Sequence, residues 1–334
     1  MNLTEGIILK ANKGLYHVHT SRGVIVCRLR GNLKKQFEFS TSRSRARKVT
    51  ETRKMSTTDP VAVGDRVRID IDGSRAGPLG DEGVIDEVLP RSNEVARTRR
   101  VIGAAYGEGR HVLVANVEQL IVVFAAAEPR PDLWKLDRFL AIAESIGLAV
   151  VIVANKTDLV NAATLEAEFS LFRRIGYRVL PTSAATGAGV DELRALLLGK
   201  ISTFAGPSGV GKSSLLNALN PELLRHVSEI GELTFKGRHG TTSAELVPLD
   251  PGAAYESTGW VADTPGLRQV ELWKVPSEVL PSCFVEFEPF LGSCRFQDCR
   301  HLHEPHCAVK AAVERGDIDA RRYRSYVQLS GQTA

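Results

Sequence analysis

The sequence predicts a multidomain protein with a small N-terminal β-barrel, a central α/β domain built on a parallel sheet, and a short Cys/His-rich C-terminal domain. Short Val/Ile-rich runs broken by turn residues fill the first 93 residues or so, and apolar runs alternate with helical stretches from about residue 111 to residue 273. With 334 residues, 43% hydrophobic and 25% charged, the chain has room for two or three domains. We expect them at residues 1–100, 101–275 and 276–334.

The N-terminal runs read GIILK, LYHVHT, GVIVCRLR, DRVRIDID and EGVIDEVL. Strands of this number and length fit a compact barrel such as the OB-fold, a frequent nucleic-acid binder, although an SH3-like barrel would show the same pattern. Ten Lys or Arg residues lie between residues 28 and 54, against only Glu38 and Glu51. Residues 43–54 have little apolar content, so we expect a loop there. It is either a solvated loop without a partner or an RNA contact through Arg43, Arg45, Arg47 and Lys48.

The start of the chain has no basic leader before a long apolar core, so we expect no secretory signal and a cytosolic protein. The most apolar stretch, residues 112–127, contains Asn116, Glu118 and Gln119. It is too short and too polar to cross a bilayer, and we expect a buried strand there.

A phosphate-binding loop is predicted at GPSGVGKS, residues 206–213, which fits the pattern GxxxxGK[ST] between the apolar run ISTFA and the helix start SLLNAL. Glycines let backbone N–H groups turn toward phosphates, and the helix N-terminus adds positive potential. Lys212 would reach the β- and γ-phosphate oxygens, and the Ser213 hydroxyl would hold magnesium. The alternative, a Gly-rich turn with a chance Lys-Ser, does not explain the flanking strand and helix.

A base-binding loop is predicted at NKTD, residues 155–158, directly after the apolar run AVVIVA. The carboxylate of Asp158 can accept from the N1–H and the exocyclic amine of guanine together, whereas adenine has no such donor pair. Asn155 would support the loop and Lys156 would cover the base. Alone, the motif would also fit an ordinary turn before a helix. Together with the phosphate loop it predicts guanine recognition, and TSA at residues 182–184 would complete the pocket.

Two further segments resemble the switches of a GTP-hydrolysing enzyme. DTPG, residues 263–266, matches DxxG, in which Asp263 orients magnesium through water and the Gly266 amide senses the γ-phosphate. GRHGTT, residues 237–242, offers Thr241 and Thr242, and either hydroxyl could bind magnesium.

Leu267 follows DTPG where many GTPases carry a Gln that positions water, so we expect slow intrinsic hydrolysis that a partner accelerates. His239 could position or deprotonate that water. It could also be an exposed loop His or an RNA contact.

Base recognition precedes phosphate recognition along the chain, which reverses the usual order and indicates a circularly permuted GTPase domain. One consequence is that DTPG is joined directly to the C-terminal domain. Nucleotide state could therefore be transmitted to that domain, a hypothesis that hydrogen exchange in the GDP and GTP-analogue states would test.

A metal site is predicted in the C-terminal domain, where Cys294, Cys299 and Cys307 lie within fourteen residues together with histidines. Three thiolates and one imidazole satisfy a closed, structural zinc site. The spacing alone leaves His301 in competition with His303 and His306. Beyond it, IDARRYRSYVQL is expected to form a helix packed on the metal module, with a possible RNA-facing side.

The β-rich front, the motif order NKTD, TSA, GPSGVGKSS, GRHGTT, DTPG, and CRFQDCRHLHEPHC followed by RYRSY resemble the RsgA (YjeQ) family over nearly the whole chain. The resemblance implies an OB-fold, a circularly permuted GTPase domain and a C-terminal α-helical zinc domain with ligands Cys294, Cys299, His301 and Cys307. One departure is Gly240, since the family's switch usually reads GRHTTT; this leaves the magnesium-binding threonine open between Thr241 and Thr242. The apolar residue after DTPG is similar to the family.

The resemblance also implies a GTPase that binds the small ribosomal subunit and its rRNA, acts late in subunit maturation, and is released on hydrolysis. A GTP-dependent regulator of another RNA or protein is the alternative. We expect a monomer with no membrane contact, GTP and GDP as substrate and product, Mg²⁺ and one structural Zn²⁺. The expected catalytic residues are Lys212, His239, Thr241, Thr242, Asp263 and Gly266, with magnesium at Ser213, Thr241 and Asp263. The expected GTP-binding residues are Asn155, Lys156, Thr157, Asp158, Ser183, Ala184, Ala205, Gly206, Pro207, Ser208, Gly209, Val210, Gly211, Lys212, Ser213 and Ser214.

Overall fold

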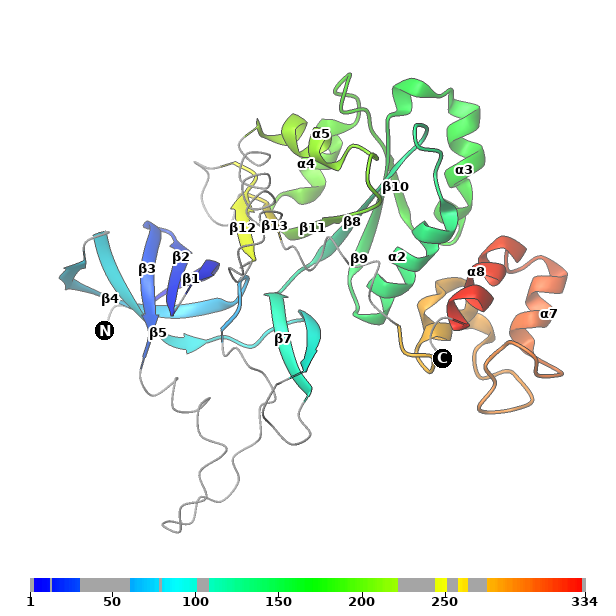
Figure 1. The fold of residues 1–334 in the computed structure, drawn as a ribbon, viewed down its shortest axis with the longest axis horizontal. Coiled ribbons are helices and arrows are strands. Elements are labelled where there is room, and N and C mark those ends of the chain that lie inside the picture. Colours follow the sequence, from blue (N-terminus) through cyan, green and yellow to red (C-terminus); the bar gives the residue numbers. More distant parts are fainter. Residues whose placement is uncertain are drawn as a thin grey trace, which may run out of the picture. The chain divides into compact units, whose positions relative to one another are not determined.

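The computed structural model describes residues 3–12, 14–30, 61–77, 80–100, 108–221, 244–250, 258–263 and 275–331. The chain divides into two compact units, and Figure 1 shows its elements. The first comprises Met1–Val117, Leu198–Ile201 and His226–Gly266, and the second Glu118–Leu197, Ser202–Arg225 and Leu267–Ala334. The boundaries predicted at residues 100 and 275 remain predictions. Several predicted site residues lie outside the described residues: Arg43, Arg45, Arg47, Lys48, His239, Thr241, Thr242 and Gly266.

The first unit holds a closed β-barrel, which confirms the predicted N-terminal fold. Its order β1-β2-β3-β5-β4 closes through a β1–β4 pairing, and only β3 and β5 run parallel. The strands match the predicted Val/Ile-rich runs: β1 (Leu3–Asn12), β2 (Leu15–Thr20), β3 (Gly23–Leu29), β4 (Arg66–Gly77) and β5 (Gly80–Val88).

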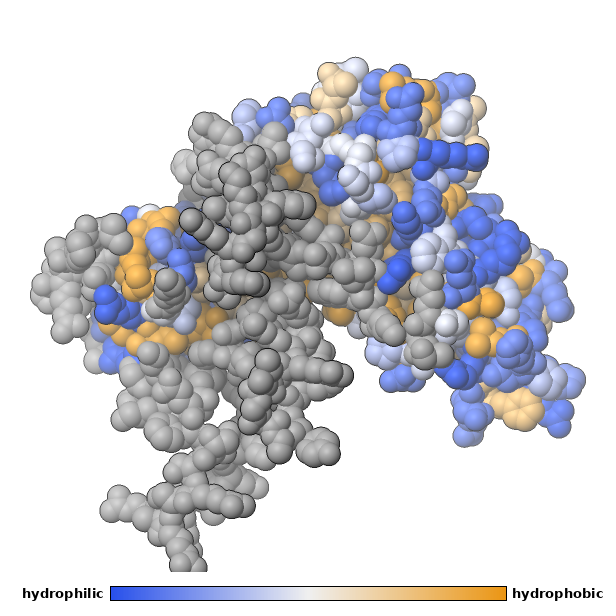
Figure 2. All heavy atoms as spheres, viewed as in Figure 1, coloured by the Kyte–Doolittle hydropathy of each residue, from blue (hydrophilic) through white to orange (hydrophobic). Residues whose placement is uncertain are grey.

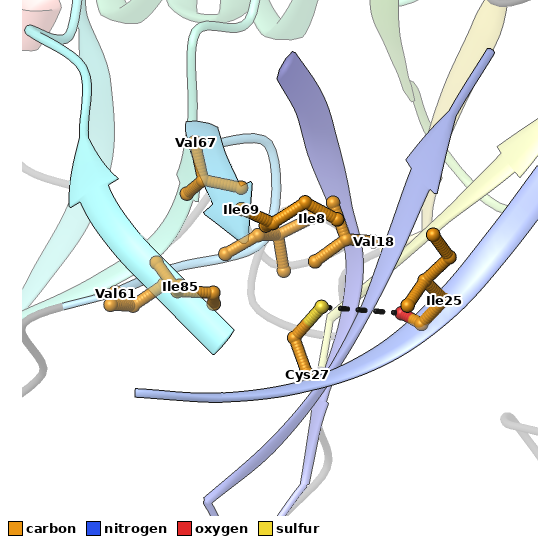
Figure 3. Close-up of a cluster of buried hydrophobic side chains, with 8 residues drawn as sticks. All are labelled: Ile8, Val18, Ile25, Cys27, Val61, Val67, Ile69 and Ile85. Atoms are coloured by element: carbon orange, nitrogen blue, oxygen red, sulfur yellow. Dashed lines mark hydrogen bonds between the residues drawn. The ribbon is translucent and has the colours of Figure 1, made fainter. Parts of the chain in front are cut away.

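The barrel core consists mainly of β-branched side chains that point inward from the strands. Figure 3 shows them facing one another, with the Cys27 thiol directed at the carbonyl oxygen of Ile25 at 3.7 Å. Burial raises the pKa of Cys27 to about 12, so this thiol is protonated and packs as a small apolar group. The cluster comprises Ile8, Val18, Ile25, Cys27, Val61, Val67, Ile69 and Ile85.

The apolar stretch 112–127, predicted as one buried strand, is two strands, and the prediction was wrong on this point. β7 (Glu108–Ala115) pairs with β6 (Glu94–Arg100), and β8 (Gln119–Ala125) belongs to the second unit. Asn116 separates them because it adopts the left-handed conformation at φ 56°. Its side chain accepts from Ser92 N and donates to Gly64 O, both at 2.9 Å, which holds the chain in this turn.

Two short strands extend the sheet of the barrel on its β1 side. β12 (Glu245–Pro248) pairs antiparallel with β1 and with β13 (Trp260–Asp263). The predicted switch residue Asp263 is thus the last residue of a strand in the same sheet as the barrel.

The second unit contains a parallel sheet in the order β10-β9-β8-β11, as the alternation of apolar runs and helical stretches predicted. Its strands are rich in β-branched residues, and β8 is buried along its whole length. Asp132 and Asn161 accept from Lys135 N and Thr164 N, which caps two of the helices. The elements are α2 (Leu133–Ser145), β9 (Ala149–Asn155), η1 (Thr157–Leu159), α3 (Ala162–Arg174), β10 (Arg178–Pro181), α4 (Val190–Leu197), β11 (Ile201–Ala205) and α5 (Lys212–Leu219).

The C-terminal module of this unit follows with η3 (Leu280–Cys283), η4 (Val285–Phe290), α7 (Ala308–Arg315) and α8 (Ala320–Ser330). Figure 2 shows mostly hydrophilic side chains on the visible face of the described residues, with hydrophobic ones scattered between them. Within the described ranges, the helices are all too short or too polar to span a membrane.

Candidate functional site

The phosphate loop has the strand–loop–helix context that its motif requires. β11 is buried throughout and leads into the loop, and α5 begins at Lys212. Two glycines are sterically obligatory. A Cβ on Gly206 (φ 142°) would lie 2.1 Å from Val123 O, and one on Gly211 (φ 92°) would lie 2.3 Å from Asn155 Nδ2. The absence of a side chain at Gly211 therefore lets the phosphate loop lie directly against Asn155 of the base loop.

Lys212 lies across its own loop. Its Nζ donates to Gly206 O at 2.7 Å and to Pro207 O at 2.6 Å, so the ammonium is held against the backbone that would surround phosphates. Phosphate oxygens, being charged acceptors, would take over these donors on binding. Ser213 and Ser214 follow in the first turn of α5 with exposed side chains, where hydroxyls can reach a phosphate or a magnesium ion.

Asn155 connects the base loop to its neighbours from a buried position. Its amide donates to Val210 O in the phosphate loop at 2.9 Å, and its carbonyl oxygen accepts from Ala184 N and Thr182 Oγ1, both at 3.2 Å. The structure therefore brings together the three predicted segments NKTD, TSA and GPSGVGKSS around one buried amide. Thr157 adds to this assembly, since its N–H and its hydroxyl both donate to Thr182 O.

Asp158 is exposed and aimed by Ser183. The buried Ser183 hydroxyl donates to Asp158 Oδ1 at 2.6 Å, which fixes the carboxylate while leaving acceptor capacity on both oxygens. Lys156, the residue between Asn155 and Thr157, adopts the left-handed conformation at φ 62°. Such strain in a non-glycine residue is typical of binding loops held by their surroundings.

One contact of the base loop was not predicted. Lys156 Nζ donates to the backbone oxygen of Glu128, in the segment that leads from β8 to α2. Pro129, the next residue, lies beside Gly209 of the phosphate loop, within 3.8 Å of where a Cβ would stand. No motif marks this segment, and only its position after a central parallel strand could have indicated it.

The predicted switches are only partly described. β13 ends on Asp263, whose backbone lies opposite Glu245 of β12. The residues His239, Thr241, Thr242 and Gly266 lie outside the described residues, as does the connection from DTPG to the C-terminal module.

The predicted metal ligands converge in the C-terminal module. The ligand atoms of Cys294, Cys299, His301 and Cys307 all lie within 4.8 Å of one another. Cys294 Sγ lies 3.8 Å from Cys307 Sγ, and His301 Nδ1 lies 3.5 and 3.4 Å from these two sulfurs. Zinc bonds of about 2.3 Å to sulfur and about 2.0 Å to nitrogen give tetrahedral edges of about 3.8 and 3.5 Å, so the donor set fits zinc. His303 and His306 are exposed and outside the cluster.

The state of these side chains suits metal ligation. Burial lowers the pKa of His301 against the opposing effect of Glu304, so the imidazole is neutral at physiological pH. Burial raises the pKa of Cys299 to about 12, and zinc binding must therefore displace its proton. The site rests on aromatic side chains of α8, whose Tyr323 hydroxyl donates to His301 O at 2.8 Å and whose Tyr326 hydroxyl donates to Arg300 O. These two tyrosines therefore pack on the metal module, as predicted for this helix.

Glu304 organises the loop between the ligands, a role that the sequence did not reveal. Its carboxylate accepts from the backbone N–H groups of Arg300, Leu302 and His303 at 2.9–3.1 Å. Burial raises the pKa of Glu304, but these backbone donors outweigh it and lower the pKa to about 2, from an ordinary value of 4.5. The folded-state pKa is depressed, so this stabilisation is present above pH 4.5 and is lost as the pH falls toward 2.

Replacing Glu304 with glutamine is therefore expected to speed zinc release to a chromophoric chelator by about tenfold or more, the usual effect of losing a residue that supports metal ligands. The amide keeps one acceptor but loses the charge that the backbone donors stabilise. Glu288→Gln, an exposed change in the same module, is the matched control and should release zinc at the wild-type rate. Equal release from both variants would contradict the role of Glu304.

A phosphate loop that contacts a guanine-type NKTD loop, with the two in reversed chain order, defines a circularly permuted P-loop GTPase. Residues 5–79 match the RsgA N-terminal domain, and residues 88–273 match the RsgA GTPase. The small ribosomal subunit biogenesis GTPase RsgA of Gemmatimonas aurantiaca is 42% identical over 98% of this chain and 96% of its own. The RsgA of Moorella thermoacetica is also 42% identical, over 97% of this chain and 95% of its own. The chain belongs to the RsgA family and is a GTP-hydrolysing enzyme.

Solved structures give the same result for the fold. YjeQ from Thermotoga maritima is 34% identical and superposes with a TM-score of 0.71 over 99% of this chain and 98% of its own. YloQ, described as a circularly permuted GTPase, is 31% identical and superposes with a TM-score of 0.69 over 99% of this chain and 95% of its own. The predicted family, fold class and GTPase activity are thus confirmed.

Proposed function

We propose that this GTPase binds the small ribosomal subunit and its rRNA, acts late in the maturation of that subunit, and is released when GTP is hydrolysed. The observation that carries the GTP part is the contact of Asn155 with both Val210 and Ala184, which joins the base and phosphate loops into one site. The names of the relatives, small ribosomal subunit biogenesis GTPase, support the choice of particle.

Different protein groups bind the guanine base and the phosphates of the nucleotide. Asp158, held by the Ser183 hydroxyl, accepts from the guanine edge, and the Ala184 N–H, which donates to Asn155, helps to shape the base pocket. The backbone of residues 206–214 and the Lys212 ammonium bind the phosphates and neutralise charge during in-line attack of water on the γ-phosphate. Magnesium would neutralise part of the phosphate charge. Ser213, a switch threonine and Asp263 would hold it.

The remaining roles are assigned by chemistry. An apolar Leu267 after DTPG cannot orient the attacking water, so hydrolysis is slow until the ribosomal particle reorganises the site, and His239 is the group available to position water then. Cys294, Cys299, His301 and Cys307 would hold zinc in a structural role, since four protein ligands leave no position for a substrate or water. The enzyme acts as a cytosolic monomer. Its barrel domain, with the basic segment 43–48, and its zinc domain both bind rRNA.

Purified small subunits are expected to raise GTP turnover at least tenfold, and large subunits are not. Turnover is measured as phosphate release at saturating GTP, with Lys212→Ala as the control for contaminating activity, since loss of this charge removes transition-state stabilisation. Stimulation that vanishes in the variant supports the proposal.

Absence of stimulation by any ribosomal particle would overturn the ribosomal part. The chain would then be a GTP-dependent regulator of another RNA or protein, and activators would be sought among those. A salt titration is a second test of rRNA binding. If several rRNA phosphates are contacted, the logarithm of the association constant falls by about 0.7 to 0.9 per contact for each tenfold increase in salt.

A further inference from the structure

The strands that carry the switch segments belong to the sheet of the N-terminal barrel. In the first unit, Lys10 of β1 pairs with Glu245 of β12, and Glu245 pairs with Asp263 of β13. Figure 1 shows β12 and β13 as the short pair beside the barrel strands. A single row of residues across three neighbouring strands therefore leads from the barrel to the residue at which DTPG begins.

An ion pair fixes one end of this hairpin to the barrel. Lys10 Nζ lies 2.9 Å from Glu245 Oε2, with 38% and 19% of the two side chains exposed. The register between β1 and β2 shifts between Ile8 and Lys10, so that β1 carries a bulge at this point. Bulges re-aim side chains at the edge of a pairing, and this one lies next to the residue that contacts β12.

A ring contact fixes the other end. The imidazole of His19 on β2 meets the indole of Trp260 edge-on, with 5.1 Å between ring centroids and an interplanar angle of 73°. Trp260 is buried and lies opposite Pro248, at the end of the hairpin away from Asp263. Burial lowers the pKa of His19, so the ring is neutral at physiological pH and its packing there does not depend on charge.

We propose that Lys10, Glu245 and Trp260 are positioning residues that couple the barrel to hydrolysis: they hold β12 and β13 so that Asp263 follows any movement of β1. This inference rests on the proposed function and adds to it a route of activation. Both ends of this strand pair thus contact the barrel strands β1 and β2. Binding of an RNA particle to the barrel would move this strand pair and with it the strand that ends on Asp263.

The test is a charge-swap cycle on the ion pair. Lys10→Glu and Glu245→Lys each place like charges 2.9 Å apart in the present geometry, and the double variant K10E/E245K restores an attractive pair. Glu5→Lys is the matched control: Glu5 lies on the same strand and pairs with Arg68 of β4 at 3.1 Å, away from the hairpin. All four proteins are measured as full-length chains.

Two readouts are expected to move together. Each single variant should lose about fivefold or more of the turnover at saturating small subunits, the low end of ordinary coupling between sites, while the subunit concentration for half-maximal turnover stays the same. Amides of residues 258–263 should exchange faster in the GTP-analogue state. The double variant should return both readouts to within about twofold of wild type.

Other outcomes overturn the inference. If the single variants behave like Glu5→Lys, the hairpin is not coupled to the barrel through this pair. If only the half-maximal subunit concentration rises, Lys10 contacts RNA directly and positions nothing. If the wild type is not stimulated at all, the proposed function fails, and hydrogen exchange of residues 258–263 alone decides the inference. Unchanged exchange in the single variants overturns it. Faster exchange in the single variants that returns to the wild-type rate in the double variant supports it.

Discussion

Replacing Asp158 with asparagine is expected to weaken GTP binding by about a hundredfold or more and to make xanthosine triphosphate the better ligand. The carboxylate accepts from two guanine donors, and an amide can accept from only one of them while its N–H₂ faces the other amine. Xanthine carries a carbonyl in place of that amine. The side-chain amide of the variant would then donate to the carbonyl and accept from N1–H, which restores the paired geometry.

Dissociation constants for GTP, ATP and xanthosine triphosphate, measured by displacement of a fluorescent nucleotide, check this exchange. Asp191→Asn is the control, because Asp191 is an exposed aspartate at the start of α4 in the same unit. Ser183→Ala should weaken GTP binding less than Asp158→Asn, since it removes only the hydroxyl that aims the carboxylate at 2.6 Å. GTP affinity within about threefold of wild type in Asp158→Asn would remove Asp158 from the base site.

The nucleotide loops could be predicted from sequence because their positions follow from the topology of a parallel sheet. NKTD, TSA and GPSGVGKSS each follow an apolar run, and the carboxyl ends of parallel strands meet at one edge, so segments distant in sequence had to converge. The hydrogen bond of Asn155 with Val210 spans 55 residues and still obeys this rule. The three cysteine ligands were predictable for a simpler reason, since they are close along the chain and zinc accepts few donor sets. The choice of His301 over His303 and His306 came from the family resemblance, because spacing alone left it open.

Contacts that depend on tertiary packing could not be predicted. Residues 112–127 are mostly apolar, and the hydrogen bonds that the buried Asn116 makes to Ser92 and Gly64 divide them into two strands. In α2, Asp137 reads as part of the polar face of an amphipathic helix. Its partners, Arg321 and Arg322, lie 184 and 185 residues away on the C-terminal helix. The sequence shows charge and periodicity but not which charged side chain is buried.

That buried network joins α2 to the C-terminal module. The side chain of Arg322 is 1% exposed and binds Glu286 through Nε at 2.6 Å and Nη2 at 2.9 Å, while Nη1 donates to Asp137 at 2.8 Å. Arg321 donates to the second oxygen of Asp137 at 2.6 Å, and the guanidinium of Arg322 lies over the ring of Phe284. All members are hydrogen-bonded, so the cost of burying these charges is offset only while the set stays complete.

Arg322→Met is accordingly expected to lower the free energy of unfolding by about 3–5 kcal/mol, because it leaves the Glu286 carboxylate, 7% exposed, without its partner. Urea unfolding followed by circular dichroism measures the loss. Arg315→Met provides the control, since the Arg315–Asp317 pair is 56% and 48% exposed and should contribute less than about 1 kcal/mol.

A second variant separates charge from packing. Changing Arg322 and Glu286 together to methionine removes the uncompensated carboxylate as well as its partner, and should recover part of the stability lost in Arg322→Met, since an apolar pair can replace a buried ion pair of similar volume. A double variant less stable than Arg322→Met would mean that the shape of the site, and not charge burial, dominates. A loss below about 1 kcal/mol in Arg322→Met would show that the C-terminal module stays docked on α2 through its apolar contacts alone.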